Sequence, residues 1–156
     1  MIRVSCRSPI GQKTAIRSAE SMNAVLAEIL KEDDHFWLTG AGDVILTFSD
    51  KSRDASLGVM FRKPFGYLLT YDNNWPTDAR KELYVSVAGS DFRELVSLFV
   101  GGDFFNFWRD FFVSREKARE AIMQFCATGE QPVAVQWMRK LSAPKIPDER
   151  MHGGMY

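Results

Sequence analysis

Apolar side chains recur with helical spacing in two segments of the chain. In the first segment, the apolar positions i, i+3, i+4, i+7 and i+8 are Met22, Val25, Leu26, Ile29 and Leu30. In the second segment, the same positions are Ala118, Ala121, Ile122, Phe125 and Cys126. This spacing puts one apolar stripe along a helix. We therefore expect one helix over about residues 19–32 and another between Ser114 and Gly129.

Polar and turn-forming residues at the ends of both segments support these helices. Ser18 and Ser114 can each accept a hydrogen bond from the free amides of a first helical turn. Gly129 suits the left-handed residue that follows many helices, and Pro132 prevents continuation. The acidic run 32–34 lies where the helix dipole disfavours negative charge, so we expect it to help end the first helix.

Short apolar runs separated by turn residues predict the strands. The runs are Lys13–Arg17 (a short strand or an arm), Phe36–Thr39, Val44–Phe48, Leu57–Phe61, Phe65–Tyr71, Leu83–Val87, a run that ends in Phe111–Val113, and Val133–Trp137. We expect the second and third runs to form a hairpin around residues 40–43, and the fourth and fifth to form another around residues 62–64. Residues 72–76 are a loop by composition.

Two segments allow more than one interpretation. Residues 92–100 fit a strand or a short helix, and we favour a helix or irregular structure because the apolar spacing is helical. Residues 99–113 are the part of the chain richest in aromatic side chains. These side chains either pack in the core or form an exposed loop that presents Phe104, Phe105 and Trp108 to a partner.

Together these elements predict one α+β domain over residues 1–142. We expect an antiparallel sheet of about six strands, with two amphipathic helices packed on one face. The proline- and glycine-containing residues 143–156 predict a loose C-terminal tail. The sequence shows neither an internal repeat nor a linker that would divide the domain.

Composition and charge exclude several classes of protein. With 46% apolar and 13% aromatic residues among 156, the chain has enough apolar surface to fold rather than stay disordered. Its 20 basic and 20 acidic side chains cancel, which argues against sequence-independent nucleic-acid binding. The charges are uneven, because residues 1–17 carry four basic side chains and no acid, and the middle of the chain is acidic.

Other features of the sequence bear on where the protein works. No run approaches the ~18 apolar residues of a membrane helix. The N-terminus lacks the apolar segment of a secretory signal. Cys6 and Cys126 lie far apart in the sequence and fit neither a disulfide framework nor metal-ligand spacing. We therefore expect a cytoplasmic protein with no membrane partner.

Residues suited to catalysis or cofactor binding are scarce. His35 and His152 are the two histidines, too few for a histidine-based metal site. Residues 40–43 lack the third glycine of a phosphate-binding loop. Asp50 and Asp54 could do acid–base chemistry only in a pocket, and a solvated surface is the simpler interpretation. We expect no catalytic residue, no metal and no cofactor.

A spaced motif runs from the second helix into the last predicted strand. Its residues are Ala118, Ala121, Phe125, Thr128, Gly129, Pro132 and Trp137. This motif resembles the C-terminal signature of immunity protein family one of bacterial polymorphic toxin systems. The early helix, the paired strands and the central strand Phe65–Tyr71 are also similar to that family's arrangement. Each signature residue has a structural role there, so the motif indicates fold and family rather than a binding site.

The resemblance implies a non-enzymatic cytoplasmic antidote. Such a protein binds a cognate secreted toxin, commonly a nucleic-acid deaminase or nuclease, and blocks access to its active site. The acidic middle of the chain is consistent with this role, because clefts that hold nucleic acid are basic. Zero net charge departs from the acidic balance of a nucleic-acid mimic, so inhibition by charge mimicry and by a loop plug both remain open.

We expect the contacts with the toxin to lie in loops and on exposed polar edges. The first group of expected partner-binding residues is Asp72, Asn74, Trp75 and Asp78. The second group is Asp103, Phe104 and Trp108. We expect no direct contact with nucleic acid, and the sequence leaves the oligomeric state open.

Two rival classes of function differ from an immunity protein in what they would show. A small-molecule-binding or scaffold domain of the same fold would have a pocket but no toxin partner. An enzyme acting through carboxylates would show turnover that is lost on changing Asp50 or Asp54.

Overall fold

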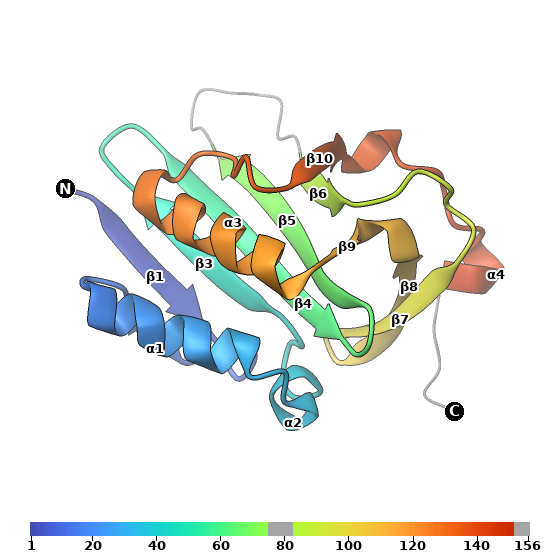
Figure 1. Ribbon diagram of the computed structural model, residues 1–156, viewed down its shortest axis with the longest axis horizontal. Coiled ribbons are helices and arrows are strands. Elements are labelled where there is room, and N and C mark those ends of the chain that lie inside the picture. Colours follow the sequence, from blue (N-terminus) through green and yellow to red (C-terminus); the bar gives the residue numbers. More distant parts are fainter. Residues whose placement is uncertain (75–82, 152–156) are drawn as a thin grey trace.

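Antiparallel strands form the body of the protein in the computed structural model, which describes residues 1–74 and 83–151 without the side chains of Asn74, Asp148 and Glu149 (Figure 1). The main sheet has eight strands in the order β10-β6-β5-β4-β3-β1-β2, with β9 beside β5. Their bounds are β1 (Arg3–Arg7), β2 (Lys13–Ala15), β3 (Val44–Ser49), β4 (Asp54–Arg62), β5 (Gly66–Asn74), β6 (Leu83–Val87), β9 (Phe112–Val113) and β10 (Gln136–Arg139). A second sheet pairs β7 (Leu95–Val100) with β8 (Asp103–Trp108).

Two long helices cover one face of the main sheet. They are α1 (Ala19–Leu30) and α3 (Arg115–Thr128), which lie side by side over β1, β3, β4 and β5 (Figure 1). Their predicted apolar stripes are buried: Val25, Leu26, Ile29 and Leu30 in α1, and Ala118, Ala121, Ile122 and Phe125 in α3. The α+β fold with two amphipathic helices on one face is therefore confirmed, although the sheet has more strands than the six expected.

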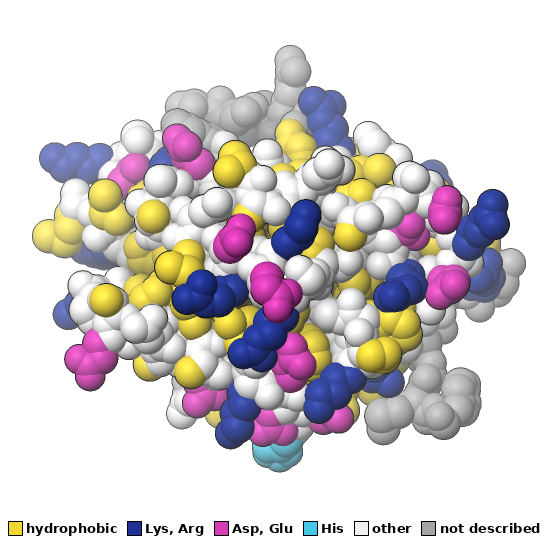
Figure 2. Space-filling view, in the orientation of Figure 1, with side chains coloured by type: hydrophobic (Ala, Val, Ile, Leu, Met, Phe, Trp, Pro, Cys, Tyr) yellow, Lys and Arg dark blue, Asp and Glu magenta, His cyan; other side chains and the backbone are white. Residues whose placement is uncertain are grey.

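The predicted helix ends are also confirmed. The Ser18 side chain accepts a hydrogen bond from the Ser21 amide, and the Ser114 side chain accepts one from the Lys117 amide. Gly129 follows α3 with φ 71°, in the left-handed region that an L side chain rarely adopts. On the outer side of these helices, acidic and basic side chains are intermixed (Figure 2).

A second, smaller core lies on the opposite face of the main sheet. Met60, Leu68 and Val85 point away from the two long helices because side chains alternate along a strand. The β7–β8 hairpin covers them with Val96 and Leu98. The hairpin therefore covers the part of this opposite face that contains Met60, Leu68 and Val85.

The C-terminal stretch contacts this second core. Ala143 and Ile146 pack against it, between η2 (Lys140–Ser142) and the short helix α4 (Asp148–Met151). The indole Nε1 of Trp108 donates a 2.7 Å hydrogen bond to the Pro144 carbonyl. Within the described residues, the part of the chain expected to be a loose tail thus lies against β8.

Four local predictions were wrong. Residues 133–135, expected to begin the last strand, form a turn before β10. Residues 36–39 do not form a strand, because the Asp33 carboxylate accepts the His35 amide at 3.0 Å and starts the short helix α2 (Asp34–Trp37). Residues 95–100 are a strand, since their backbone pairs with β8. Residues 72–74 are not a loop but the end of β5, paired with β4.

Candidate functional site

Three segments that contain charged residues or predicted partner-binding residues meet at one end of the main sheet. Asp54, which begins β4, is paired with Asn74 at the end of β5. The guanidinium of Arg53 donates a hydrogen bond to the Thr128 carbonyl at the end of α3. We call residues 50–54, 72–74 and 128–132 the acidic end, because they contain four acids (Asp50, Asp54, Asp72 and Glu130) and two bases (Lys51 and Arg53).

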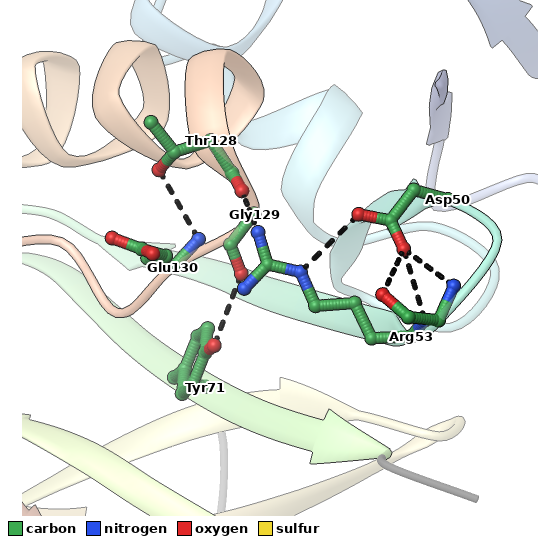
Figure 3. Close-up of polar contacts among 7 residues, drawn as sticks. Asp50, Arg53, Tyr71, Thr128, Gly129 and Glu130 are labelled. Atoms are coloured by element: carbon green, nitrogen blue, oxygen red, sulfur yellow. Dashed lines mark hydrogen bonds and ion pairs between the residues drawn. The ribbon is translucent and has the colours of Figure 1, made fainter. Parts of the chain in front are cut away.

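Arg53 joins two of these segments (Figure 3). Its guanidinium lies 5.3 Å from the ring centroid of Phe48, and its Nε lies 3.7 Å from the Asp50 carboxylate. The Tyr71 hydroxyl donates a 3.0 Å hydrogen bond to the Gly129 carbonyl beside it. These contacts fix the Thr128–Gly129 turn of the family signature against the sheet, so the turn is structural.

The carboxylate of Asp50 serves the turn between β3 and β4. Its Oδ1 accepts the Ser52 amide at 2.8 Å, the Ser52 hydroxyl at 2.9 Å and the Arg53 amide at 3.0 Å. The hydrogen bonds from Ser52 hold the pKa of the Asp50 carboxyl below its ordinary value. A carboxylate with a lowered pKa is a weak general base, which makes the acid–base interpretation of Asp50 less favourable.

Two acids of this end share the sheet face that α1 and α3 do not cover. Asp54 lies two residues before Ser56 on β4, and Ser56 is the cross-strand partner of Asp72 on β5. Side chains two residues apart on a strand share a face, so Asp54 and Asp72 lie on the same face of the sheet. Asp54 is exposed, and Asp72 is half-buried. Among residues 1–74 and 83–151, the Asp72 Oδ1 is buried and finds no hydrogen-bond partner. A carboxylate oxygen in that condition carries a desolvation cost that an incoming donor would remove.

Two members of the second group of expected contact residues, Asp103 and Phe104, lie at the opposite end of the sheet. Asp103 begins β8, and its carboxylate accepts the Phe104 amide at 2.8 Å. The adjoining Gly101 amide donates a 2.8 Å hydrogen bond to the Ala41 carbonyl, in the loop that leads into β3. Since β3 runs from that loop to the acidic end, the two groups are separated by the length of the strand.

The remaining predicted contact residues differ in exposure, and some of them are not described. Trp108 is only 7% exposed and lies in the second core, against the expectation of an exposed side chain. Phe104 is half-buried, with its ring 5.4 Å from that of Phe99. Trp75 and Asp78 lie outside the described residues, and Asn74 is placed only by its backbone in β5.

Asp54, Arg53 and Glu130 were not among the contact residues predicted from the sequence. Asp54 appears there only as a possible catalytic acid. A usable signal was present, because charged residues flank the turn between two strongly apolar strands. What the sequence could not show is that the end of α3 returns to the same place.

The described residues offer little for cofactor chemistry. They contain no group of three or more His, Cys, Asp or Glu side chains that could hold a metal ion. Burial raises the pKa of the Cys6 thiol to about 11 and that of Cys126 to about 12, so both are poor nucleophiles at neutral pH. A cavity of about 440 Å³ lies between α1, α2 and the β1–β2 turn.

None of the helices within residues 1–74 and 83–151 is both long and apolar enough to cross a bilayer.

Comparison with known proteins identifies the family. No curated protein matches this chain. A family model described as immunity protein Imm1 matches residues 10–139, which include α1, the central strands, α3 and β10. The match covers most of the chain and includes the Thr128–Gly129 turn that Arg53 and Tyr71 hold. The resemblance seen in the sequence is confirmed: this chain belongs to the Imm1 family of immunity proteins.

Proposed function

We propose that this immunity protein neutralises a secreted toxin that acts on nucleic acid, a deaminase or a nuclease, by covering its active site. The observation that carries the proposal is the position of Asp54 and Asp72 at the acidic end, on the sheet face that α1 and α3 do not cover. A toxin that binds nucleic acid needs a basic cleft. Carboxylates presented at the end of two neighbouring strands in a rigid sheet complement such a cleft and accelerate the encounter.

The acidic end is suited to contact because its frame is fixed while two of its carboxylates, those of Asp54 and Glu130, are exposed. Arg53 and Tyr71 hold the turn after α3, and Asp50 holds the turn after β3. A preorganised surface loses little conformational entropy when a partner docks. We include Asp72 and the predicted Asn74, Trp75 and Asp78 in the proposed contact surface, since they continue directly from this end of β5 in the sequence.

Inhibition by contact alone needs no chemistry from the immunity protein. The turn hydrogen bonds to Asp50 and the raised thiol pKa values of Cys6 and Cys126 support this part of the proposal. Turnover of a nucleotide or nucleic acid by the purified protein would contradict it.

The test is a protection assay with the toxin encoded beside this protein. Cells expressing the toxin domain receive either the native protein, an Asp54→Lys/Asp72→Lys double variant or an Asp103→Lys variant. We expect the double variant to lose protection and to bind the purified toxin at least about tenfold more weakly, because close charge pairs at such interfaces carry several kcal/mol. We expect Asp103→Lys, at the other end of the sheet, to protect like the native protein.

Thermal melting of each variant separates loss of contact from loss of folding. If Asp103→Lys fails to protect while the folded double variant protects fully, the contact surface is the β7–β8 tip and not the acidic end. Assays of the free toxin for deamination and for cleavage of nucleic acid decide the substrate class. A toxin with neither activity would contradict that part of the proposal.

A further inference from the structure

The strand β2 ends the main sheet, and its backbone pattern shows which groups face outward. The Ser8 amide donates to the Gln12 carbonyl at 2.8 Å, and the Ile16 amide donates to the Val4 carbonyl at 2.9 Å. Hydrogen-bonded pairs alternate along an antiparallel ladder, so the pair Cys6–Thr14 between them is also bonded. The amides and carbonyls of Lys13 and Ala15 must therefore face away from β1.

No strand of the described chain occupies this outer edge of β2. All three residues of the strand, Lys13, Thr14 and Ala15, are exposed. An edge with free donors and acceptors is a template for an added strand. Such a strand would bond to Lys13 and Ala15 and lie about 4.8 Å from β2.

The cavity of about 440 Å³ adjoins this edge on the side of the helices. Thr14 lines it, since its side chain lies on the same face as that of its partner Cys6. Val25, Ile29 and Phe36 supply apolar walls. The cavity is also lined by two acidic and two basic residues, which are Glu28, Asp33, Lys31 and His35. A residue opposite Thr14 on an added strand would direct its side chain into this cavity.

The other face of the β1–β2 pair is basic. Lys13 is paired with Arg7, and residues 1–17 contain Arg3 and Arg17 besides, with no acid. The Arg7 guanidinium is already bound to Asp43 at 2.7 Å, which leaves Lys13 as the exposed charge at the edge itself. Residues opposite Lys13 and Ala15 on an added strand would face these cations.

We propose that the outer edge of β2 binds an extended peptide segment of a partner protein whose side chains alternate between apolar and acidic. Apolar side chains enter the cavity beside Thr14, and acidic side chains lie next to Lys13 on the other face. Backbone hydrogen bonds to Lys13 and Ala15 supply the affinity, and the alternation supplies the specificity. This surface is distinct from the acidic end, so the inference does not rest on the proposed function.

Fluorescence anisotropy with a labelled octapeptide of alternating Asp and Val tests the proposal. Two matched probes accompany it, an alternating Lys–Val peptide and an Asp–Val peptide N-methylated at alternate residues. We expect saturable binding of the first probe below about 1 mM and at least about tenfold weaker binding of the other two. Equal binding of the three probes, or no saturable binding of the first, would overturn the proposal.

Two variants and one control locate the site. Ala15→Pro removes an outward amide that β1 does not use, so the fold should tolerate it. Lys13→Glu reverses the charge at the edge. We expect both to weaken binding of the Asp–Val peptide at least about tenfold with melting points within a few degrees of native, whereas Lys117→Glu on α3 should leave binding unchanged.

Lysine on an edge strand can also serve only to prevent aggregation. In that case Lys13→Glu would bind the peptide as the native protein does, and the proposal would be wrong. Should Ala15→Pro fail to fold, the N-methylated probe and Lys13→Glu still decide between the two outcomes.

Discussion

Gly129 lies directly against the ring of Phe48, so that a methyl group added at Gly129 would overlap the ring. The backbone there has φ 71°, and the neighbouring Thr128 carbonyl is bound by Arg53. One small residue thus allows the end of α3 to approach β3 closely. The approach brings the acidic residue Glu130 to the same end of the sheet as Asp54.

Replacing Gly129 with Ala should destabilise the protein more than the same change at another left-handed glycine. Gly102 has φ 89° with no neighbouring atom within 4 Å of an added methyl, so Gly102→Ala should cost about 1–2 kcal/mol from the backbone alone. Gly129→Ala should cost roughly 1–3 kcal/mol more because the methyl also displaces Phe48. Urea unfolding of the two variants measures the difference, and equal losses would show that the contact with Phe48 relaxes freely.

Tyr71→Phe should lower the free energy of unfolding by about 1–3 kcal/mol. The change leaves the buried Gly129 carbonyl without its 3.0 Å hydrogen bond, while the ring keeps its contacts with Phe125 and Trp137. Unfolding curves with an unchanged denaturant slope would attribute the loss to this bond. A stability equal to that of the native protein would mean that another donor replaces the hydroxyl.

Asp110→Ala should destabilise the loop between β6 and β7. The Asp110 carboxylate accepts the amides of Asp91 and Phe92, each at 3.1 Å, and Phe92 has φ 49° although it is not glycine. Hydrogen bonds to a charged acceptor stabilise by about 1.5–3 kcal/mol, and we expect a loss in that range. Asp91→Ala is the control, since it keeps both amides and should change the stability of the protein little.

Stability should fall as the pH rises above about 9. Burial raises the pKa of Cys6 from 9.0 to about 11 and that of Cys126 from 9.0 to about 12, and it also raises the pKa of Tyr67 and Tyr71. Between pH 9 and the raised thiol pKa values, the unfolded chain has lost thiol protons that the folded protein keeps, so each cysteine contributes a decline of up to about 1.4 kcal/mol per pH unit. The two tyrosines act in the same direction above their ordinary pKa of 10.0.

Cys126→Ala tests this assignment. The variant is less stable at pH 7 if the thiol packs well, but its stability should decline less steeply between pH 9 and about 11 than that of the native protein. Urea unfolding at a series of pH values measures the two slopes. Parallel slopes would show that Cys126 ionises in the folded state as readily as in the unfolded chain.

Much of the fold could be predicted because the helices carry complete local signals. The stripe from Val25 to Leu30 and the serine caps agree with each other, and tertiary packing does not override them. The pair β4–β5 was likewise predictable from its apolar runs. The strand β1 was not, because Arg3 and Arg7 give it a polar pattern and its pairing with β3 is distant in sequence. The segment 36–39 was misassigned because one carboxylate, Asp33, decides in favour of a helical turn.

The candidate site was less predictable for a geometric reason. The charges at positions 54, 72 and 103 are evident in the sequence, but their separation depends on where each strand begins and ends. Strand order places Asp54 and Asp72 together, and it places Asp103 at the opposite end beside Ala41. Trp108 was assigned to a surface because an aromatic cluster alone does not reveal which of its rings faces the core.

The hydrogen bond from Trp108 to Pro144 has a practical consequence for recombinant work. Fragments that stop at residue 142 would expose the indole of Trp108 and the apolar side chains of the second core against which Ala143 and Ile146 pack. An exposed apolar patch of that kind promotes aggregation during purification. Expression clones intended for toxin complexes should therefore keep the polypeptide at least through Met151, with any affinity tag placed on a spacer beyond it.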